Sequence, residues 1–130
     1  MKRIISTPDA PGAAEYGRFS YSQAVVAGGL VFVAGQGPFD PATGAIVGTT
    51  IQEQVRQSFA NVKAILEAAG SSTDRIVNVL FLLANPEDFA GLNEEWARWF
   101  PSHPPARYGV KLGVDVPGLL VSIRMTAYTA

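Results

Sequence analysis

The sequence predicts an α+β fold, in which two helices cover one face of a mixed β-sheet. Three observations indicate it: a β-prone hairpin near the start, two amphipathic stretches of helical period, and two long apolar stretches of strand character. Along the chain they give the order β-β-(β)-α-β-α-β-β. A length of 130 residues suits one domain, so we expect residues 1–130 to form a single unit around one core.

The first predicted elements are two strands at residues 24–27 and 30–34, both rich in valine and alanine. Gly28-Gly29 joins them, and a two-residue glycine link is typical of a tight β-hairpin. The stretch from Asp40 to Gly44 has the composition of a turn. A short edge strand is expected directly after this turn, at residues 45–47.

A long helix is predicted after Thr50, because Thr50 and Glu53 have the spacing of a capping box. Apolar residues then recur every three or four positions until Gly70 provides a stop signal. A second helix is predicted from Asn85-Pro86, with proline in its first turn. We interpret its tryptophans as core or interface anchors; the full apolar stripe is Phe89, Leu92, Trp96, Trp99 and Phe100.

The remaining stretches predict strands. Residues 75–84 are apolar almost without interruption, which predicts a central strand buried on both faces, either by a helix and a partner subunit or by two layers of one chain. Residues 107–112 are expected to form another strand, and in residues 119–129 apolar and more polar side chains alternate, as in a strand with two unlike faces. Because both helices lie on one side, we expect self-association to cover the other side of the sheet.

Composition argues against several classes of protein. The chain is 48% hydrophobic and 16% charged with net charge −1, so we expect neither disorder nor nucleic-acid binding. No apolar stretch approaches the roughly 20 residues of a membrane span, and the pattern of a signal peptide is missing. We therefore expect a cytoplasmic protein with no membrane partner. With no cysteine and the single histidine His103, no thiol chemistry and no multi-histidine metal site are expected.

The most informative candidate for function is Arg107, which follows Pro104-Pro105-Ala106 at the entrance to a predicted strand. Its planar, permanently charged guanidinium suits bidentate binding of a small carboxylate. The alternative is a structural arginine paired with a carboxylate from elsewhere in the fold. Other polar residues suited to binding a small anion and orienting water are Tyr21, Gln36, Asn93, Ser122 and Arg124.

Several motifs, taken together, resemble those of the Rid family, also called YjgF or UK114. They are Tyr21-Ser22-Gln23-Ala24, Val33-Ala34-Gly35-Gln36, Asp40-Pro41 with Thr43-Gly44, residues 57–70, Asp88-Phe89 to Asn93, and Pro105-Ala106-Arg107. The resemblance implies a chorismate-mutase-like (ferredoxin-like) fold and a homotrimer with ligand clefts between subunits. It also implies hydrolysis of reactive enamines and imines of the 2-aminoacrylate type to 2-oxo acids and ammonia, without cofactor or metal.

The resemblance also assigns roles by position. Arg107 is expected to bind the substrate carboxylate and Tyr21 to line the cleft, with Asn93 beside it. Backbone groups around Ala34-Gly35 and Tyr108-Gly109 are expected to close the pocket.

One position departs from the family pattern. Where archetypal deaminases have a water-orienting glutamate, this chain has Ser122, with Arg124 two residues on. If the protein is a deaminase, Ser122 is expected to hold the water and Arg124 to add affinity for an anion. A hydroxyl can hold water but is a poor general base. Two hypotheses follow, an imine deaminase of altered specificity and a non-catalytic trimer that binds a 2-oxo acid. A ribonuclease agrees poorly with the lack of a basic stripe.

Overall fold

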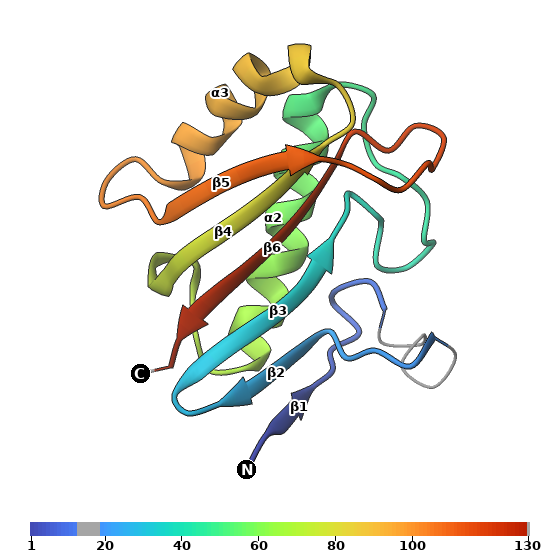
Figure 1. Cartoon of the computed structure of the whole chain (residues 1–130). Helices are drawn as coiled ribbons and strands as arrows, with labels where there is room; N and C mark the ends of the chain where they lie inside the picture. Colours follow the sequence, from blue (N-terminus) through green and yellow to red (C-terminus); the bar gives the residue numbers. More distant parts are fainter. Residues whose placement is uncertain (13–18, 130) are drawn as a thin grey trace.

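A computed structural model describes residues 1–12 and 19–129 and confirms the predicted arrangement of two helices on a mixed sheet (Figure 1). The strands are β1 (Arg3–Ile5), β2 (Ala24–Ala27), β3 (Leu30–Gln36), β4 (Ile76–Leu83), β5 (Ala106–Lys111) and β6 (Val121–Tyr128). The helices are α2 (Ile51–Ala68) and α3 (Phe89–Trp99), and the short 3₁₀ turns are η1 (Thr73–Arg75) and η2 (Pro86–Asp88).

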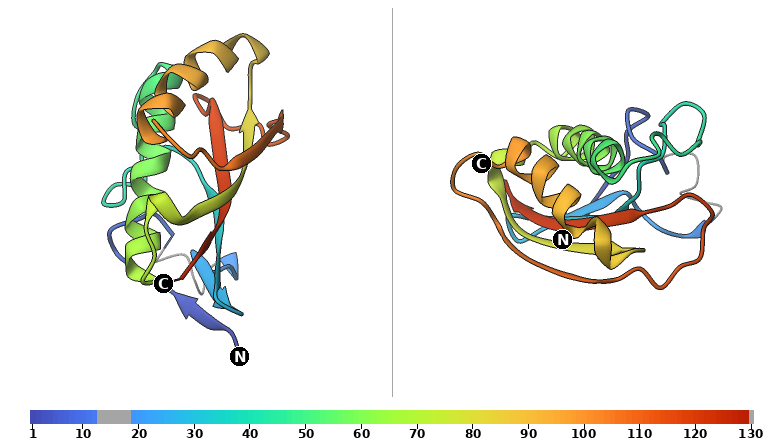
Figure 2. Two further views of the ribbon diagram at one scale, coloured as in Figure 1. Left: turned by 90° about the vertical axis from the view of Figure 1, so that its left-hand side faces the viewer. Right: turned by 90° about the horizontal axis from the view of Figure 1, so that it is seen from above.

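The six strands form one sheet in the order β1-β2-β3-β6-β4-β5. Strands β4 and β5 are parallel, and all other neighbours are antiparallel. Both helices lie on the same face of this sheet, which Figure 2 shows from two directions. The chain therefore has a covered face, toward α2 and α3, and an open face on the opposite side.

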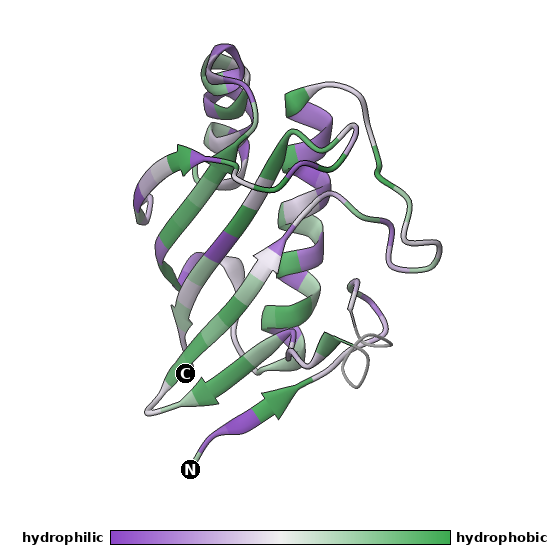
Figure 3. Cartoon of the chain, turned by 45° about the vertical axis from the view of Figure 1, so that its right-hand side comes forward, coloured by the Kyte–Doolittle hydropathy of each residue, from purple (hydrophilic) through white to green (hydrophobic). Residues whose placement is uncertain are grey.

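The core lies between the sheet and the helices. Alternate residues of β6, from Val121 to Ala127, are buried against the helical layer, as the sequence pattern predicts. Helix α2 contributes Val55, Phe59 and Val62, all fully buried. Figure 3 shows hydrophobic residues over most of the sheet, whereas in both helices they alternate with hydrophilic ones. Within the described part of the chain, no helix is both long and apolar enough to cross a bilayer.

Two predictions of local structure are confirmed by the backbone. Gly28 and Gly29 have φ of 58° and 77°, the left-handed values that a tight turn between β2 and β3 requires of both central residues. Helix α2 begins with the predicted capping box: the Thr50 hydroxyl accepts from the Glu53 amide, and the Glu53 carboxylate accepts from the Thr50 amide at 3.1 Å.

Other predictions need correction. Residues 45–47 form no strand; Ile46 makes only an isolated bridge to Phe39, because the backbone turns away after one pair. Strand β1 was not expected, since its three residues are too few for a sequence pattern. The apolar strand β4 is covered by the helices on one face, and on its open face Leu80 and Leu82 are only half-buried, so among the described residues no second layer of the same chain covers it.

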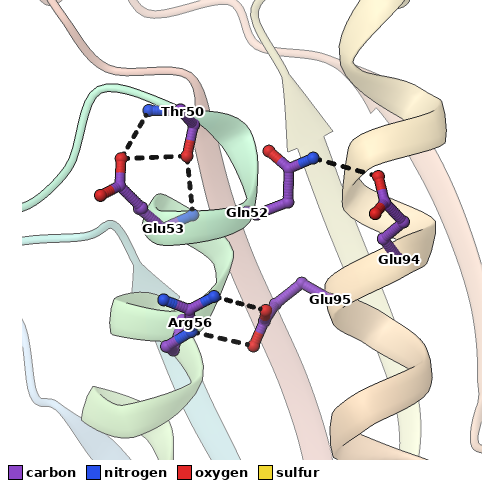
Figure 4. A network of polar contacts seen from close by, with 6 residues as sticks. All are labelled: Thr50, Gln52, Glu53, Arg56, Glu94 and Glu95. Atoms are coloured by element: carbon purple, nitrogen blue, oxygen red, sulfur yellow. Dashed lines mark hydrogen bonds and ion pairs between the residues drawn. The ribbon is translucent and has the colours of Figure 1, made fainter.

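Polar contacts hold α3 in place against α2 (Figure 4). Arg56 donates to both carboxylate oxygens of Glu95, at 2.9 and 3.3 Å, and Glu95 is buried. One turn earlier in α2, the Gln52 amide donates to Glu94 at 3.1 Å. Asn93 directly precedes these two glutamates in α3. The same contacts therefore fix the position of Asn93 relative to the sheet.

Candidate functional site

Arg107 lies on the edge strand β5, and its side chain extends toward α3. Its Nη2 donates a hydrogen bond of 2.7 Å to the Asn93 side-chain oxygen. The guanidinium carbon lies 4.7 Å from the ring centroid of Trp96, 5.3 Å from that of Phe81 and 5.7 Å from that of Phe89. Three rings within about 6 Å stabilise a cation through their π-faces. We call Phe81, Phe89 and Trp96 the aromatic cage.

The environment of Arg107 is partly desolvated, and this lowers the pKa of its guanidinium from the usual value. The group remains charged at neutral pH, since an arginine does not lose its proton in proteins. Arg107 is nonetheless exposed, so its charged guanidinium is accessible to an anionic ligand.

The carboxylate pair that was the alternative role for Arg107 is not seen in the described part of the chain. There, the ion pairs join Arg56 to Glu95 and Lys63 to Glu67. The only side-chain acceptor of Arg107 in that part is Asn93, which is neutral. Asn93 accepts from only one Nη atom of Arg107, so the other N–H groups of the guanidinium remain available to a ligand.

Gly109 makes room for the cage. Strands β4 and β5 pair in parallel register, with Val79 opposite Arg107 and Phe81 opposite Gly109. A Cβ atom at position 109 would lie 2.1 Å from a ring carbon of Phe81, far inside van der Waals contact. The absence of a side chain at Gly109 thus allows the Phe81 ring to lie over β5, beneath the guanidinium.

A hollow of about 540 Å³ opens beside Arg107. It is lined by Phe81, Leu83, Pro86, Phe89, Arg107, Tyr108, Gly109, Val110 and Lys111. Its volume and its mixture of apolar walls with a few charged groups are typical of small-molecule sites. Arg107, Tyr108 and Gly109 are residues that the sequence assigned to substrate binding, so this hollow is the candidate active site.

Ser122 and Arg124 lie elsewhere. They alternate along β6 with the buried residues of the core and therefore point to the open face. In the sheet register Ser122 lies opposite Leu82, and Arg124 opposite Leu80, which also pairs with Tyr108. Within one chain, Ser122 and Arg107 are thus on opposite faces of the sheet and separated by β4. The structure does not bring these two predicted catalytic residues together.

Two further predicted residues lie near Ser122. A Cβ atom on Gly35 would be 3.2 Å from the Ser122 hydroxyl oxygen, so the backbone of β3 passes directly beside this serine. The amide of Ala34 is occupied by a hydrogen bond to the Gln23 carbonyl at 2.8 Å. On the open face, the Ser122 hydroxyl therefore lies beside the Gly35 backbone, and Arg124 projects from the same face of β6.

Tyr21 lies in a third place, before β2. It lines a separate hollow of about 590 Å³ together with Phe39, Asp40 and neighbouring loop residues. Tyr21 does not line the hollow that contains Arg107. The predicted site residues are consequently distributed over three regions of the single chain.

Some motif residues serve the fold instead. Gln23 is buried, accepts from the Thr7 amide at 2.7 Å and donates to three carbonyls of residues 7–11, which ties the first loop to the sheet. Asn61 donates to the carbonyls of Gly37 and Phe39. Gln36, which the sequence suggested for anion binding, is buried and donates to the Ala34 carbonyl.

The aromatic cage is the part of the site that sequence reasoning did not identify. Phe89 and Trp96 were assigned to an apolar helix stripe, and Phe81 to a buried strand. The signal available was the seven-residue spacing of Phe89 and Trp96, which places both rings on one helix face. The contact with Arg107 depends on how α3 meets β5, and no local pattern encodes that contact. His103 is exposed in the loop before β5, and no group of three potential metal ligands occurs among the described residues.

Comparison with known proteins gives a consistent assignment. The family model described as endoribonuclease L-PSP matches residues 10–129. A RutC family protein of Pyrococcus horikoshii is 42% identical over 128 residues, covering 98% of both chains. The human 2-iminobutanoate/2-iminopropanoate deaminase is 34% identical, covering 98% of this chain and 90% of the human one. The crystal structure of the Rid family protein YyfA from Yersinia pestis superposes with a TM-score of 0.90 at 33% identity, covering 99% and 100%. The chain therefore belongs to the Rid (YjgF/UK114) family.

Proposed function

We propose that this protein is a hydrolytic deaminase of 2-imino acids, which converts them to 2-oxo acids and ammonia. The observation that carries the proposal is Arg107: a guanidinium held by Asn93 and three aromatic rings, at the wall of a hollow, with no carboxylate partner among the described residues. The names of relatives such as the human deaminase support the reaction class.

The proposed reaction requires little from the protein. Arg107 binds the carboxylate of the substrate and so fixes the adjacent imine carbon, which is already electrophilic. Water adds to this carbon, the resulting carbon–nitrogen single bond breaks, and ammonia leaves as the carbonyl forms. Positioning a water molecule against a bound imine accounts for acceleration through proximity. In this chain the Ser122 hydroxyl is proposed to hold that water.

This role for Ser122 requires a site between subunits, because Ser122 and Arg107 face opposite sides of the sheet within one chain. We propose a homotrimer in which the open face meets neighbouring copies. Support comes from its exposed apolar residues, among them Phe32 at 39% and Tyr128 at 45%. Light scattering at micromolar concentration is expected to give three times the chain mass of 13.8 kDa. A monomeric mass would contradict this part of the proposal.

The direct test is release of ammonia and 2-oxo acid from enzymatically generated 2-imino acids, measured against a buffer blank. Arg107→Ala is expected to reduce kcat/KM roughly 10- to 100-fold, the effect of losing hydrogen bonds to a charged group. Arg98→Ala is the matched control, because Arg98 is an exposed arginine in the last turn of α3. Equal activity of both variants would refute the role of Arg107.

A second function is favoured by one observation, the serine at position 122. With a hydroxyl in place of a carboxylate, the same Arg107 site serves a protein that binds a 2-oxo acid without turnover. That function predicts no acceleration with any imine, together with a rise in melting temperature on addition of a 2-oxo acid. Arg107→Ala is expected to abolish this rise as well.

A further inference from the structure

We propose that the hollow beside Arg107 is a side-chain pocket that selects acids with a large apolar group, such as a branched alkyl or phenyl group, over small ones. This inference rests on the proposed function and names its substrate class. The cation would bind the carboxylate, and the apolar group would lie against Phe81 and Phe89. The preferred substrates would be imino acids derived from bulky apolar amino acids.

Size is the first argument. The hollow of about 540 Å³ is in the range of pockets that enclose drug-sized ligands. A 2-aminoacrylate-type molecule, with six heavy atoms, would occupy only the part nearest the guanidinium. The remaining space is bounded by residues of β4, η2, α3 and β5, so a larger ligand has surfaces to contact.

The chemistry of the walls is the second argument. Apart from Arg107, Lys111 and the Tyr108 hydroxyl, the lining of the hollow is apolar, and it includes Phe81, Leu83, Pro86, Phe89 and Val110. The rings of Phe81 and Phe89 are stacked with an interplanar angle of 23° and a centroid distance of 6.1 Å. Phe89 is also 46% exposed, so an apolar group bound in the hollow has ring surface of Phe89 to cover.

The position of the second cation is the third argument. Lys111 follows Arg107 by four residues on the same strand, which separates their Cα atoms by about 13 Å at roughly 3.3 Å per residue. Lys111 therefore lies at the far end of the hollow and does not compete for the same carboxylate. Between the two cations the lining is apolar, which suits a hydrocarbon group better than a second anionic group.

The test uses 2-oxo acids of graded size and isothermal titration calorimetry on the intact protein. We expect 2-oxo-3-phenylpropanoate and 4-methyl-2-oxopentanoate to bind about tenfold or more tightly than 2-oxopropanoate, because each buried methylene contributes several-fold in affinity. Phe89→Ala is expected to reduce this ratio at least threefold, whereas Phe89→Leu retains most of it. The ratio cancels any effect of the substitution on Arg107, which binds the carboxylate of every ligand.

Ile4→Ala is the matched control, since Ile4 is 44% exposed and lies on β1, at the opposite edge of the sheet from β5. It is expected to leave the ratio unchanged. A ratio near one in the wild-type protein would overturn the proposal, as would an unchanged ratio in Phe89→Ala. Tighter binding of 2-oxoglutarate than of the phenyl compound would also overturn it and would indicate a dicarboxylate site that includes Lys111.

The same experiment separates this inference from the proposed function. Calorimetry with 2-oxo acids requires no turnover. Selective binding of bulky acids without imine hydrolysis would therefore refute the deaminase activity but support the side-chain pocket. Hydrolysis of small and large imines with equal kcat/KM would refute the selectivity of the pocket but support the deaminase activity.

Discussion

Gly109 offers the sharpest structural test of the site, because the aromatic cage depends on the absence of a side chain there. In Gly109→Ala the added methyl would lie 2.1, 2.4 and 2.8 Å from three ring carbons of Phe81. Optimal carbon–carbon contact is about 3.5–4.0 Å, so the ring must move by more than about 1 Å. Trp96, 5.8 Å away between ring centroids, and Phe89 restrict that movement.

Overpacking of this kind costs about 1–3 kcal/mol of unfolding free energy. The lower entropy of an unfolded alanine chain offsets roughly 0.4–1 kcal/mol of that at most. At about 3–5 °C per kcal/mol for a chain of this length, we expect the melting temperature of Gly109→Ala to fall by a few to about 10 °C. Displacement of Phe81 would also move Arg107, so the affinity for a 2-oxo acid is expected to fall.

The assay is urea unfolding followed by tryptophan fluorescence, at a fixed protein concentration so that any oligomerisation contributes equally. Gly113→Ala is the control: the position lies four residues further along, has no atom within 4 Å of an added Cβ and does not require positive φ. It is expected to be neutral or slightly stabilising. If both variants have the same midpoint and the same ligand affinity, the packing argument for Gly109 is wrong.

Three further predictions concern the cap of α2, the response to acid and the serine of the open face. Thr50→Ala removes the hydroxyl that accepts from the Glu53 amide and is expected to cost about 1 kcal/mol in urea unfolding; a loss below about 0.3 kcal/mol would contradict the capping role. Backbone amides that donate to the carboxylates of Glu53 and Asp40 lower the pKa of both groups, so their stabilising effect is present above the unfolded pKa values near 4 and is lost as the pH falls through the lower folded values. The double variant Glu53→Gln/Asp40→Asn is therefore expected to have a flatter stability profile below about pH 4, and a profile parallel to that of the wild type would count against this. Ser122→Glu supplies a carboxylate base and is expected to raise imine turnover about tenfold or more, whereas a fall in turnover with unchanged ligand binding would argue against a water-holding role at this position.

Local structure with a local cause was predictable from the sequence. The bounds of α2 follow from the capping box at Thr50 and the apolar period that ends before Gly70, and all of these interactions lie within a few residues. The two faces of β6 follow from strict alternation. Residues 45–47 were predicted wrongly, because composition did not show that the pairing with Phe39 ends after one bridge.

The candidate site was predictable only in part, because its geometry depends on long-range contacts. The chemistry of Arg107 is evident in the sequence, but its neighbours are set by the parallel pairing of β4 with β5 and by the docking of α3 through Arg56 and Glu95. The resemblance to the Rid family placed Arg107 and Ser122 in one site. The structure shows that they face opposite sides of the sheet in one chain, and this separation cannot be inferred from their spacing along the chain.

The measurement that tests the central claim most directly is a crystal structure of the protein with 2-oxo-3-phenylpropanoate bound. The account predicts that both carboxylate oxygens lie within hydrogen-bond distance of the Arg107 guanidinium, with the phenyl group against Phe81 and Phe89. It also predicts that a Ser122 hydroxyl from a neighbouring copy lies near the 2-oxo carbon. A ligand bound away from Arg107, or a hollow filled by a side chain of another subunit, would contradict the account.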